Sequence, residues 1–195
     1  LFASLLALLA ALGRLSRFAP LYALSTFYVS LIRCTPLYLQ VIFFFLALPQ
    51  LGIILDGITA GVLALSLNYG AYMSEIFRAA ISSVDRGQRE ASLALGMTPS
   101  QLMRRIILPQ AFRFAIPPIG NEFVAMLKDS SLVSATGFAQ EILWRAQKAG
   151  RQNYHNLEAL IVAAILYWIM TLVFSYLQNR IEQRMARGDR NTQHL

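Results

Sequence analysis

Long apolar segments separated by short charged segments dominate this 195-residue chain. The clearest apolar segment, residues 157–177, carries one charged residue, Glu158, over 21 residues. Residues 57–74 carry no formal charge over 18 residues. Because a membrane-spanning helix needs about 20 consecutive apolar residues, this pattern predicts helices that cross a lipid bilayer.

The pattern predicts one domain, residues 1–195, with about five membrane spans. We expect the first span, residues 1–12, to be truncated, the end of a helix whose beginning is missing from this sequence. An interfacial helix is predicted over residues 18–32, followed by a break at Thr35-Pro36, because proline disfavours helix at the preceding residue. The other spans are predicted over residues 37–48, 57–77, 111–136 (interrupted at Pro117-Pro118) and 157–177. The predicted fold class is therefore all-α and polytopic.

Composition supports a membrane protein. Hydrophobic residues make up 56% of the chain and charged residues 14%, against about 25% in soluble domains. The net charge of +7 comes from arginines that lie between apolar segments, which favours contact with membrane lipid over nucleic-acid binding. Cys34 is the only cysteine, so an intrachain disulfide and a cysteine-based metal site are excluded. We expect no cofactor and no metal.

The distribution of arginines predicts the orientation. With five spans, the first loop, the loop between the third and fourth spans, and the C-terminal tail lie on the same side of the membrane. These three segments hold most of the arginines, and the positive-inside rule places such loops in the cytoplasm. We therefore expect the N-terminus outside and the C-terminus in the cytoplasm.

The loop over residues 85–109 is much longer than the roughly 2–8 residues that a plain connection between helices needs. Residues 88–95 are strong helix formers and precede Gly96, a residue typical of the position just after a helix. Thr98, Pro99 and Gln101 then form the signature of a new helix start, with a capping box. We expect this second helix to end before Pro109. These features alone leave two interpretations open: a hairpin resting on the bilayer surface, or a docking element for a partner protein.

The spacing within this loop resembles the EAA loop of permease subunits of bacterial ABC importers. Glu90-Ala91-Ser92 is followed at family spacing by Gly96, Ile106 and Leu108-Pro109, with Ser92 in place of the second alanine. The resemblance implies a type I-like permease fold, with a cytoplasmic coupling helix that docks on a separate ATPase subunit. The residues it implies for this contact are Glu90, Ala91, Ser92, Gly96, Ile106, Leu108 and Pro109.

Other segments are similar to the polar amino-acid permeases of that family. They include Arg33-Cys34-Thr35-Pro36, where Cys34 replaces the usual glycine, residues 72–78 and 87–91, and Pro117, Asn121, Lys128, Ser131 and Leu132 of the fourth span. The resemblance implies a bacterial inner-membrane location and an amino-acid substrate. It also implies three protein partners: an ATP-binding subunit, a second permease subunit, identical or related, and an extracytoplasmic solute-binding protein.

Polar and ionisable residues interrupt two predicted spans. Such groups cost about 2.5–3.5 kcal/mol each in the membrane and normally face a cavity or each other. One hypothesis is that they line the path of an amino acid, whose ammonium and carboxylate would suit Asn121, Glu122 and Lys128. The alternative is a structural salt bridge between spans or at a subunit interface. The candidate path residues are Asn68, Tyr69, Asn121, Glu122, Lys128 and Asp129, whereas Glu75 and Arg78 are predicted to form a structural pair.

Neither lysine of the chain, Lys128 or Lys148, lies in a P-loop, and no nucleophile–base set is recognisable. The sequence therefore predicts a transport subunit and not an enzyme. The leading prediction is the permease subunit of an ATP-driven importer of a polar or charged amino acid. The alternative is a secondary carrier or channel for small polar solutes. A membrane scaffold would explain the long loop but not the polar fourth span.

Overall fold

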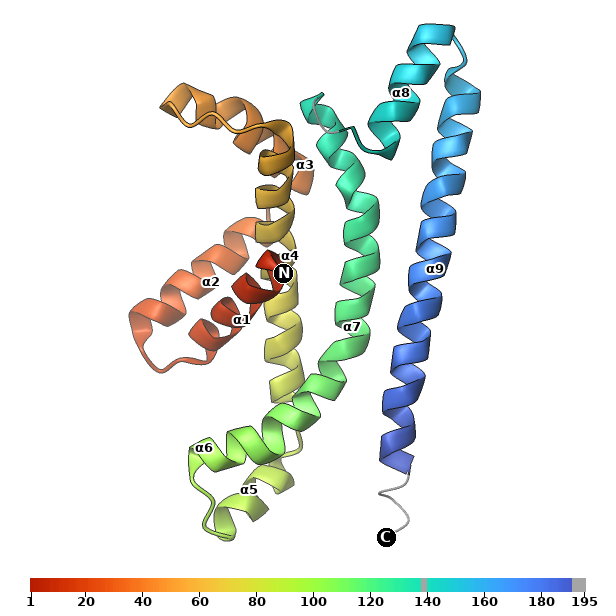
Figure 1. The fold of residues 1–195 in the computed structure, drawn as a ribbon. Coiled ribbons are helices and arrows are strands. Elements are labelled where there is room, and N and C mark those ends of the chain that lie inside the picture. The colour runs from red at the N-terminus through yellow and green to blue at the C-terminus, as the bar shows by residue number, and fades with distance from the viewer. Residues whose placement is uncertain (138–139, 191–195) are drawn as a thin grey trace.

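The computed structural model describes residues 1–137 and 140–190, with side chains to residue 185. All regular elements within this part of the chain are helical, as predicted (Figure 1). They are α1 (Phe2–Leu15), α2 (Ala19–Arg33), α3 (Leu37–Ile42), the π-helix η1 (Phe43–Ala47), the 3-10 helix η2 (Leu48–Leu51), α4 (Gly57–Ser82), α5 (Arg86–Ala94), α6 (Pro99–Leu102), the π-helix η3 (Met103–Ile107), α7 (Leu108–Asp129), the 3-10 helix η4 (Ser130–Thr136), α8 (Ile142–Asn153) and α9 (Asn156–Arg190).

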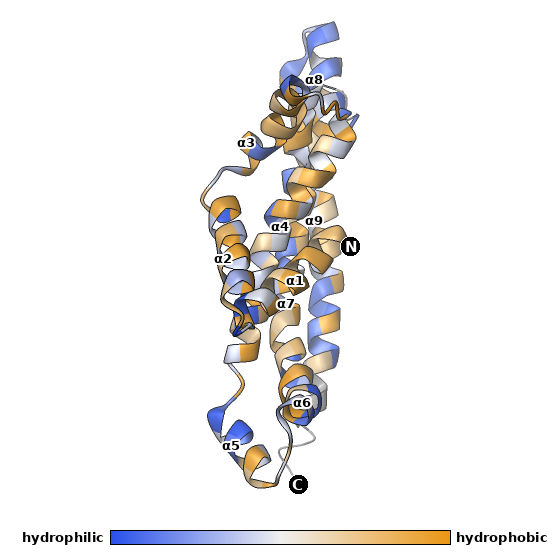
Figure 2. Ribbon diagram, turned by 90° about the vertical axis from the view of Figure 1, so that its left-hand side faces the viewer, coloured by the Kyte–Doolittle hydropathy of each residue, from blue (hydrophilic) through white to orange (hydrophobic). Residues whose placement is uncertain are grey.

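Three long helices run along the molecule, in the order α4, α7 and α9 across it (Figure 1). The hairpin of α1 and α2 packs across α4, and α7 contacts both α4 and α9. Helices α5 and α6 lie at one end of the molecule together with the end of α9, and α8 lies at the opposite end (Figures 1 and 2).

Among the described residues, 156–185 form the one helix that is long and apolar enough to cross a membrane by itself, with a mean hydropathy of 2.3 over an apolar window of 18 residues. Residues 19–33 and 37–51 meet the same test together, as a pair bent by 103°. Helix α4 has 26 residues and is therefore about 39 Å long, enough to cross the roughly 30 Å hydrocarbon core. Its lower hydropathy, like that of α7, reflects polar residues within the predicted span.

The predicted break at Thr35-Pro36 is confirmed, because α2 ends at Arg33 and α3 begins at Leu37. The buried side chain of Gln40 stabilises this bend. Its Nε2 donates to the carbonyl of Ile32 at 2.9 Å, to the carbonyl of Thr35 at 3.2 Å and to Thr35 Oγ1 at 2.8 Å. The backbone acceptors that the bend leaves unpaired are thereby satisfied within the membrane region, where an unpaired group is costly.

Two predictions about proline are wrong. Helix α7 continues through Pro117-Pro118, because the φ angle of proline fits an α-helix and α7 packs against α4 and α9, which hold it in place. The second helix of the 85–109 loop does not end before Pro109. It continues through η3 into α7, because the φ angle of proline fits a helix and Pro109 therefore does not force the helical segment to end.

Helix α4 begins at a capped end outside the predicted span. The backbone N–H of Thr59 donates to Asp56 Oδ1 at 2.6 Å. Hydrogen bonds from the side chain and the backbone of Thr59 lower the pKa of the Asp56 carboxyl, which therefore stays charged at neutral pH. A negative charge at a helix N-terminus is favourable because it opposes the helix dipole.

Candidate functional site

The loop over residues 85–109, called here the coupling loop, is a fixed structure. The backbone N–H of Met97 donates to the carbonyl of Ser92 at 3.1 Å, and that of Gly96 to the carbonyl of Leu93 at 2.9 Å. These two bonds form a Schellman motif with Gly96 in the left-handed region at φ 79°. The prediction that Gly96 ends the first helix of the loop is therefore confirmed.

The second helix of the loop begins with the predicted capping box. The backbone N–H of Gln101 donates to Thr98 Oγ1 at 3.3 Å, and the backbone N–H of Thr98 donates to Gln101 Oε1 at 2.9 Å. Pro99 follows Thr98 in the first turn. Both helix ends at the Gly96 turn are thus held by local hydrogen bonds, so the turn has one defined shape.

The predicted contact residues divide between the two faces of the coupling loop. Glu90, Ala91 and Gly96 are exposed, as are Leu108 and Pro109 at the start of α7. Ser92 points inward instead: it is 6% exposed, and its Oγ donates to the carbonyl of Gln88 at 2.7 Å. Ile106 is partly buried.

Two leucines stand out on the exposed face of the coupling loop. Leu93 is 50% exposed and Leu95 is 81% exposed. Both leucines precede the Gly96 turn in the chain and follow the exposed Glu90 and Ala91. A small apolar surface with polar neighbours at the end of a rigid hairpin is suited to docking on a protein partner.

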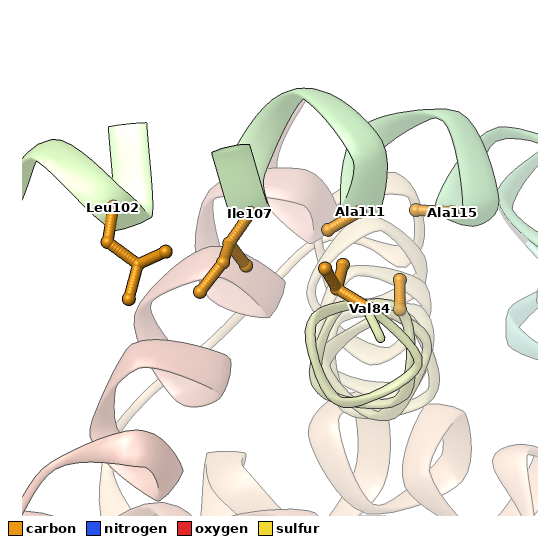
Figure 3. Close-up of a cluster of buried hydrophobic side chains, with 6 residues drawn as sticks. Val84, Leu102, Ile107, Ala111 and Ala115 are labelled. Carbon is orange, nitrogen blue, oxygen red and sulfur yellow. The ribbon is translucent and has the colours of Figure 1, made fainter. Parts of the chain in front are cut away.

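A cluster of buried apolar side chains joins the coupling loop to α4 and α7 (Figure 3). Val84 follows the end of α4, and Leu102 and Ile107 come from α6 and η3. Arg89 adds a polar link, since its Nη2 donates to the backbone carbonyl of Ile81 in the last turn of α4. The loop, the end of α4 and the start of α7 therefore form one packed unit, whose buried members are Ala80, Val84, Leu102, Ile107, Ala111 and Ala115.

A second candidate site lies where the bend between α2 and α3 faces α4 and α7. It is a cavity of about 440 Å³, called here the polar pocket. Its lining residues are Arg33, Cys34, Thr35, Pro36 and Leu37 from the bend, Asn68, Tyr69 and Tyr72 from α4, and Glu122, Ala125 and Asp129 from α7.

Hydrogen bonds between elements fix two walls of the polar pocket. The buried Asn68 donates from Nδ2 to Gln40 Oε1 at 3.1 Å, which links α4 to α3. The hydroxyl of Tyr69 donates to Asp129 Oδ2 at 2.8 Å, which links α4 to α7. Glu122 accepts no hydrogen bond and forms no ion pair within the described part of the chain, so its carboxylate is available to a ligand in the pocket.

A cluster of arginines lies next to the polar pocket, centred on Glu75. Arg78 Nη2 lies 2.9 Å from Glu75 Oε2, which confirms the predicted pair. Arg14 of α1 also contacts this carboxylate, and Arg33 Nη1 lies 4.0 Å from Glu75 Oε1. The Arg33 guanidinium also stacks on the ring of Tyr72, 5.1 Å from the ring centroid. Glu75 already has two nearer arginines, so Arg33 can bind a carboxylate in the pocket.

The structure brings four of the six candidate path residues together in the polar pocket: Asn68, Tyr69, Glu122 and Asp129. The other two lie elsewhere. Asn121 faces α9, where Gln178 Nε2 donates to its Oδ1 at 3.0 Å. Lys128 is exposed and forms no ion pair among the described residues.

The sequence predicted no path residue in the bend between α2 and α3, although Arg33 and Thr35 line the pocket there. It also did not predict Tyr72 of α4, which lines the same pocket. The only available signal was the Arg33-Cys34-Thr35-Pro36 motif beside the predicted break.

Comparison with solved structures defines the class of protein. A structure described as an amino acid ABC transporter with histidines matches with a TM-score of 0.90 and 40% sequence identity, covering 94% of this chain and 85% of that chain. An inward-facing structure of the MetNI methionine ABC transporter shares the fold, with a TM-score of 0.76 at 19% identity and coverage of 94% and 88%. The fold is that of the permease subunits of type I ABC importers.

Residues 3–187 match the family described as binding-protein-dependent transport system inner membrane component, and the chain belongs to that family. It is 43% identical to the L-cystine transport system permease protein TcyB of Bacillus subtilis, over 96% of this chain and 80% of that protein. It is 38% identical to the arginine transport system permease protein ArtQ of the same organism, over 95% of this chain and 84% of that protein. The predicted transport permease is confirmed, and the alternative of a self-contained carrier or channel is not favoured.

Proposed function

We propose that this chain imports a polar or charged amino acid and is driven by a separate ATPase docked on the coupling loop. The observation that carries the proposal is the packing of this loop into one unit with the ends of α4 and α7. The same two helices supply Asn68, Tyr69, Glu122 and Asp129 to the polar pocket.

This arrangement connects the docked ATPase mechanically to the polar pocket that would hold the substrate. A force on the exposed face of the coupling loop is passed to α4 through Val84 and the Arg89–Ile81 hydrogen bond, and to α7 through η3. Packed helices move as rigid elements, so a displacement of the loop moves the α4 and α7 walls of the pocket together, relative to the bend between α2 and α3. The Asn68–Gln40 hydrogen bond, which joins α4 to α3, is the contact that such a movement would stretch.

The chemistry of the polar pocket suits an amino acid. Glu122 and Asp129 offer carboxylates to the substrate ammonium, and Arg33 offers a guanidinium to the substrate carboxylate. A cavity of about 440 Å³ lies within the range of roughly 300–1,000 Å³ usual for small-molecule sites. The substrates in the names of TcyB and ArtQ, L-cystine and arginine, also carry these two groups.

The proposed assembly contains an ATP-binding subunit, a second permease subunit and an extracytoplasmic solute-binding protein. We place the coupling loop and the C-terminus in the cytoplasm and the N-terminus outside. The position of the end of α9 at the same end of the molecule as α5 and α6 supports this orientation (Figures 1 and 2).

Docking is tested by co-purifying the chain with a candidate ATPase subunit. Gly96→Leu forces a side chain into left-handed backbone at φ 79° and distorts the docking turn. Gly52→Leu is the matched control, since Gly52 has φ 80° and no neighbour within 4 Å, but lies far from the loop. We expect Gly96→Leu to lose the ATPase and Gly52→Leu to retain it. Equal retention of the ATPase by both variants would contradict docking on this loop.

The role of the pocket is tested separately with Glu122→Gln, which removes the charge and keeps the shape. We expect uptake of the transported amino acid into proteoliposomes to fall roughly tenfold or more, because a charged hydrogen bond is lost. Glu158→Gln on α9, an exposed position outside the pocket, should leave uptake unchanged. If Glu122→Gln leaves both the rate and the substrate selectivity unchanged, the carboxylate does not contact substrate.

A further inference from the structure

A second cavity, of about 510 Å³, lies between α1, the last turns of α4 and the first turns of α7, near the coupling loop. It is called here the apolar groove. Leu8 and Leu12 of α1 line one wall, Phe77 and Ile81 of α4 line the base, and Leu108 and Phe112 of α7 line the opposite wall. Its lining is almost entirely hydrocarbon.

The groove is open along one side. Leu8 is 48% exposed, Leu12 53%, Leu108 43% and Phe112 61%. Such an apolar surface does not hold ordered water, because a bound water molecule needs two or more polar partners. In a membrane component the medium at this surface is lipid, and an acyl chain has the shape and polarity to fill a narrow apolar groove.

Positive charge lies at the loop end of the groove. Arg104 and Arg105 of η3 precede Leu108 by about one helical turn, and both are exposed. Neither forms an ion pair among the described residues. Two unpaired guanidinium groups beside an apolar groove complement an anionic headgroup attached to an acyl chain.

We propose that the apolar groove binds an acyl chain of an anionic phospholipid, with the lipid phosphate held by Arg104 and Arg105. The lipid would lie between α1 and the unit that joins α4, α7 and the coupling loop. Membrane composition would thereby influence how firmly this unit is held against α1. The proposal requires the membrane location of the chain but neither the amino-acid substrate nor the docking of an ATPase.

The test uses the purified permease assembly and native mass spectrometry, with phosphatidylglycerol and phosphatidylcholine titrated separately as probes. Leu12→Trp fills the groove at an exposed position, and Leu9→Trp is the matched control on α1, because Leu9 is 57% exposed and does not line the groove. We expect Leu12→Trp to lose the retained phosphatidylglycerol and Leu9→Trp to keep it. The double variant Arg104→Gln/Arg105→Gln should bind it about 25-fold more weakly, at roughly fivefold per arginine.

Three outcomes would overturn the proposal. One is equal retention of phosphatidylglycerol by Leu12→Trp and Leu9→Trp. Another is equal binding of the two lipids by the unmodified assembly. The third is loss of the second permease subunit in Leu12→Trp alone, which would show that protein covers the groove. Lipid binding is read independently of uptake, so its failure would leave the proposed transport function standing.

Discussion

Arg89 Nη2 of α5 donates a hydrogen bond to the backbone carbonyl of Ile81 in the last turn of α4. The last carbonyls of a helix have no partner within the helix, so a guanidinium there satisfies an otherwise unpaired acceptor. This bond joins the surface that we assign to ATPase docking directly to a helix that lines the polar pocket.

Arg89→Gln should therefore weaken coupling without preventing docking. Loss of a hydrogen bond to a charged group costs about 1.5–3 kcal/mol, so we expect ATP-driven uptake to fall by roughly a factor of ten or more. The amount of ATPase that co-purifies should stay the same. Arg86→Gln is the control, because Arg86 is exposed on the same short helix and makes no hydrogen bond or ion pair within the described residues. A parallel loss of uptake in both variants would point to surface charge as the cause.

Tyr69→Phe removes the hydroxyl that links α4 to Asp129 of α7. Tyr69 is 3% exposed, so its ring is part of the buried packing. Phenylalanine keeps this ring, and the change therefore removes only the hydrogen bond. We expect a loss of about 1 kcal/mol in stability, measured as a lower thermal midpoint of the purified protein. Tyr38→Phe, at a residue 53% exposed, should leave the midpoint unchanged. An unchanged midpoint for Tyr69→Phe would mean that the link contributes nothing to the packing of α4 on α7.

Gly61→Ala tests the close approach of α4 to η4. A Cβ at residue 61 would lie 2.5 Å from Cγ1 and 2.7 Å from Cγ2 of Val133. We expect a destabilisation of about 1–3 kcal/mol, typical of overpacking. Val133→Ala in the same chain removes both methyl groups and should restore most of the lost stability. Failure of this second change to restore the thermal midpoint would place the strain elsewhere.

The coupling loop could be predicted from the sequence because its shape depends on neighbouring residues. Gly96 and Met97 end α5 by donating to the carbonyls of Leu93 and Ser92, and Thr98 starts α6 through its hydrogen bonds with Gln101. Such signals act over a few residues and are visible in a single chain.

The polar pocket could be predicted only in part, because it depends on which face of each helix meets its neighbours. Asn121 precedes Glu122 by one residue, and one residue turns an α-helix by about 100°. Glu122 therefore faces the pocket while Asn121 faces Gln178 of α9. The same rotation separates Asp129, which lines the pocket, from the exposed Lys128. Hydropathy does not determine which residue of either pair faces the pocket. The contribution of Arg33 depends on the bend between α2 and α3, which the hydropathy pattern does not orient either.

The central claim, that force enters through the coupling loop and reaches the polar pocket, is tested most directly at Leu95. This side chain is 81% exposed and supports no other part of the fold. The measurement is ATP-driven uptake into proteoliposomes that contain the whole assembly, with Leu95→Asp compared against Leu95→Met. A charge buried at the docking surface without a partner costs several kcal/mol, so uptake by Leu95→Asp should fall at least about tenfold, and Leu95→Met should transport normally. Equal uptake by the two variants would contradict the account.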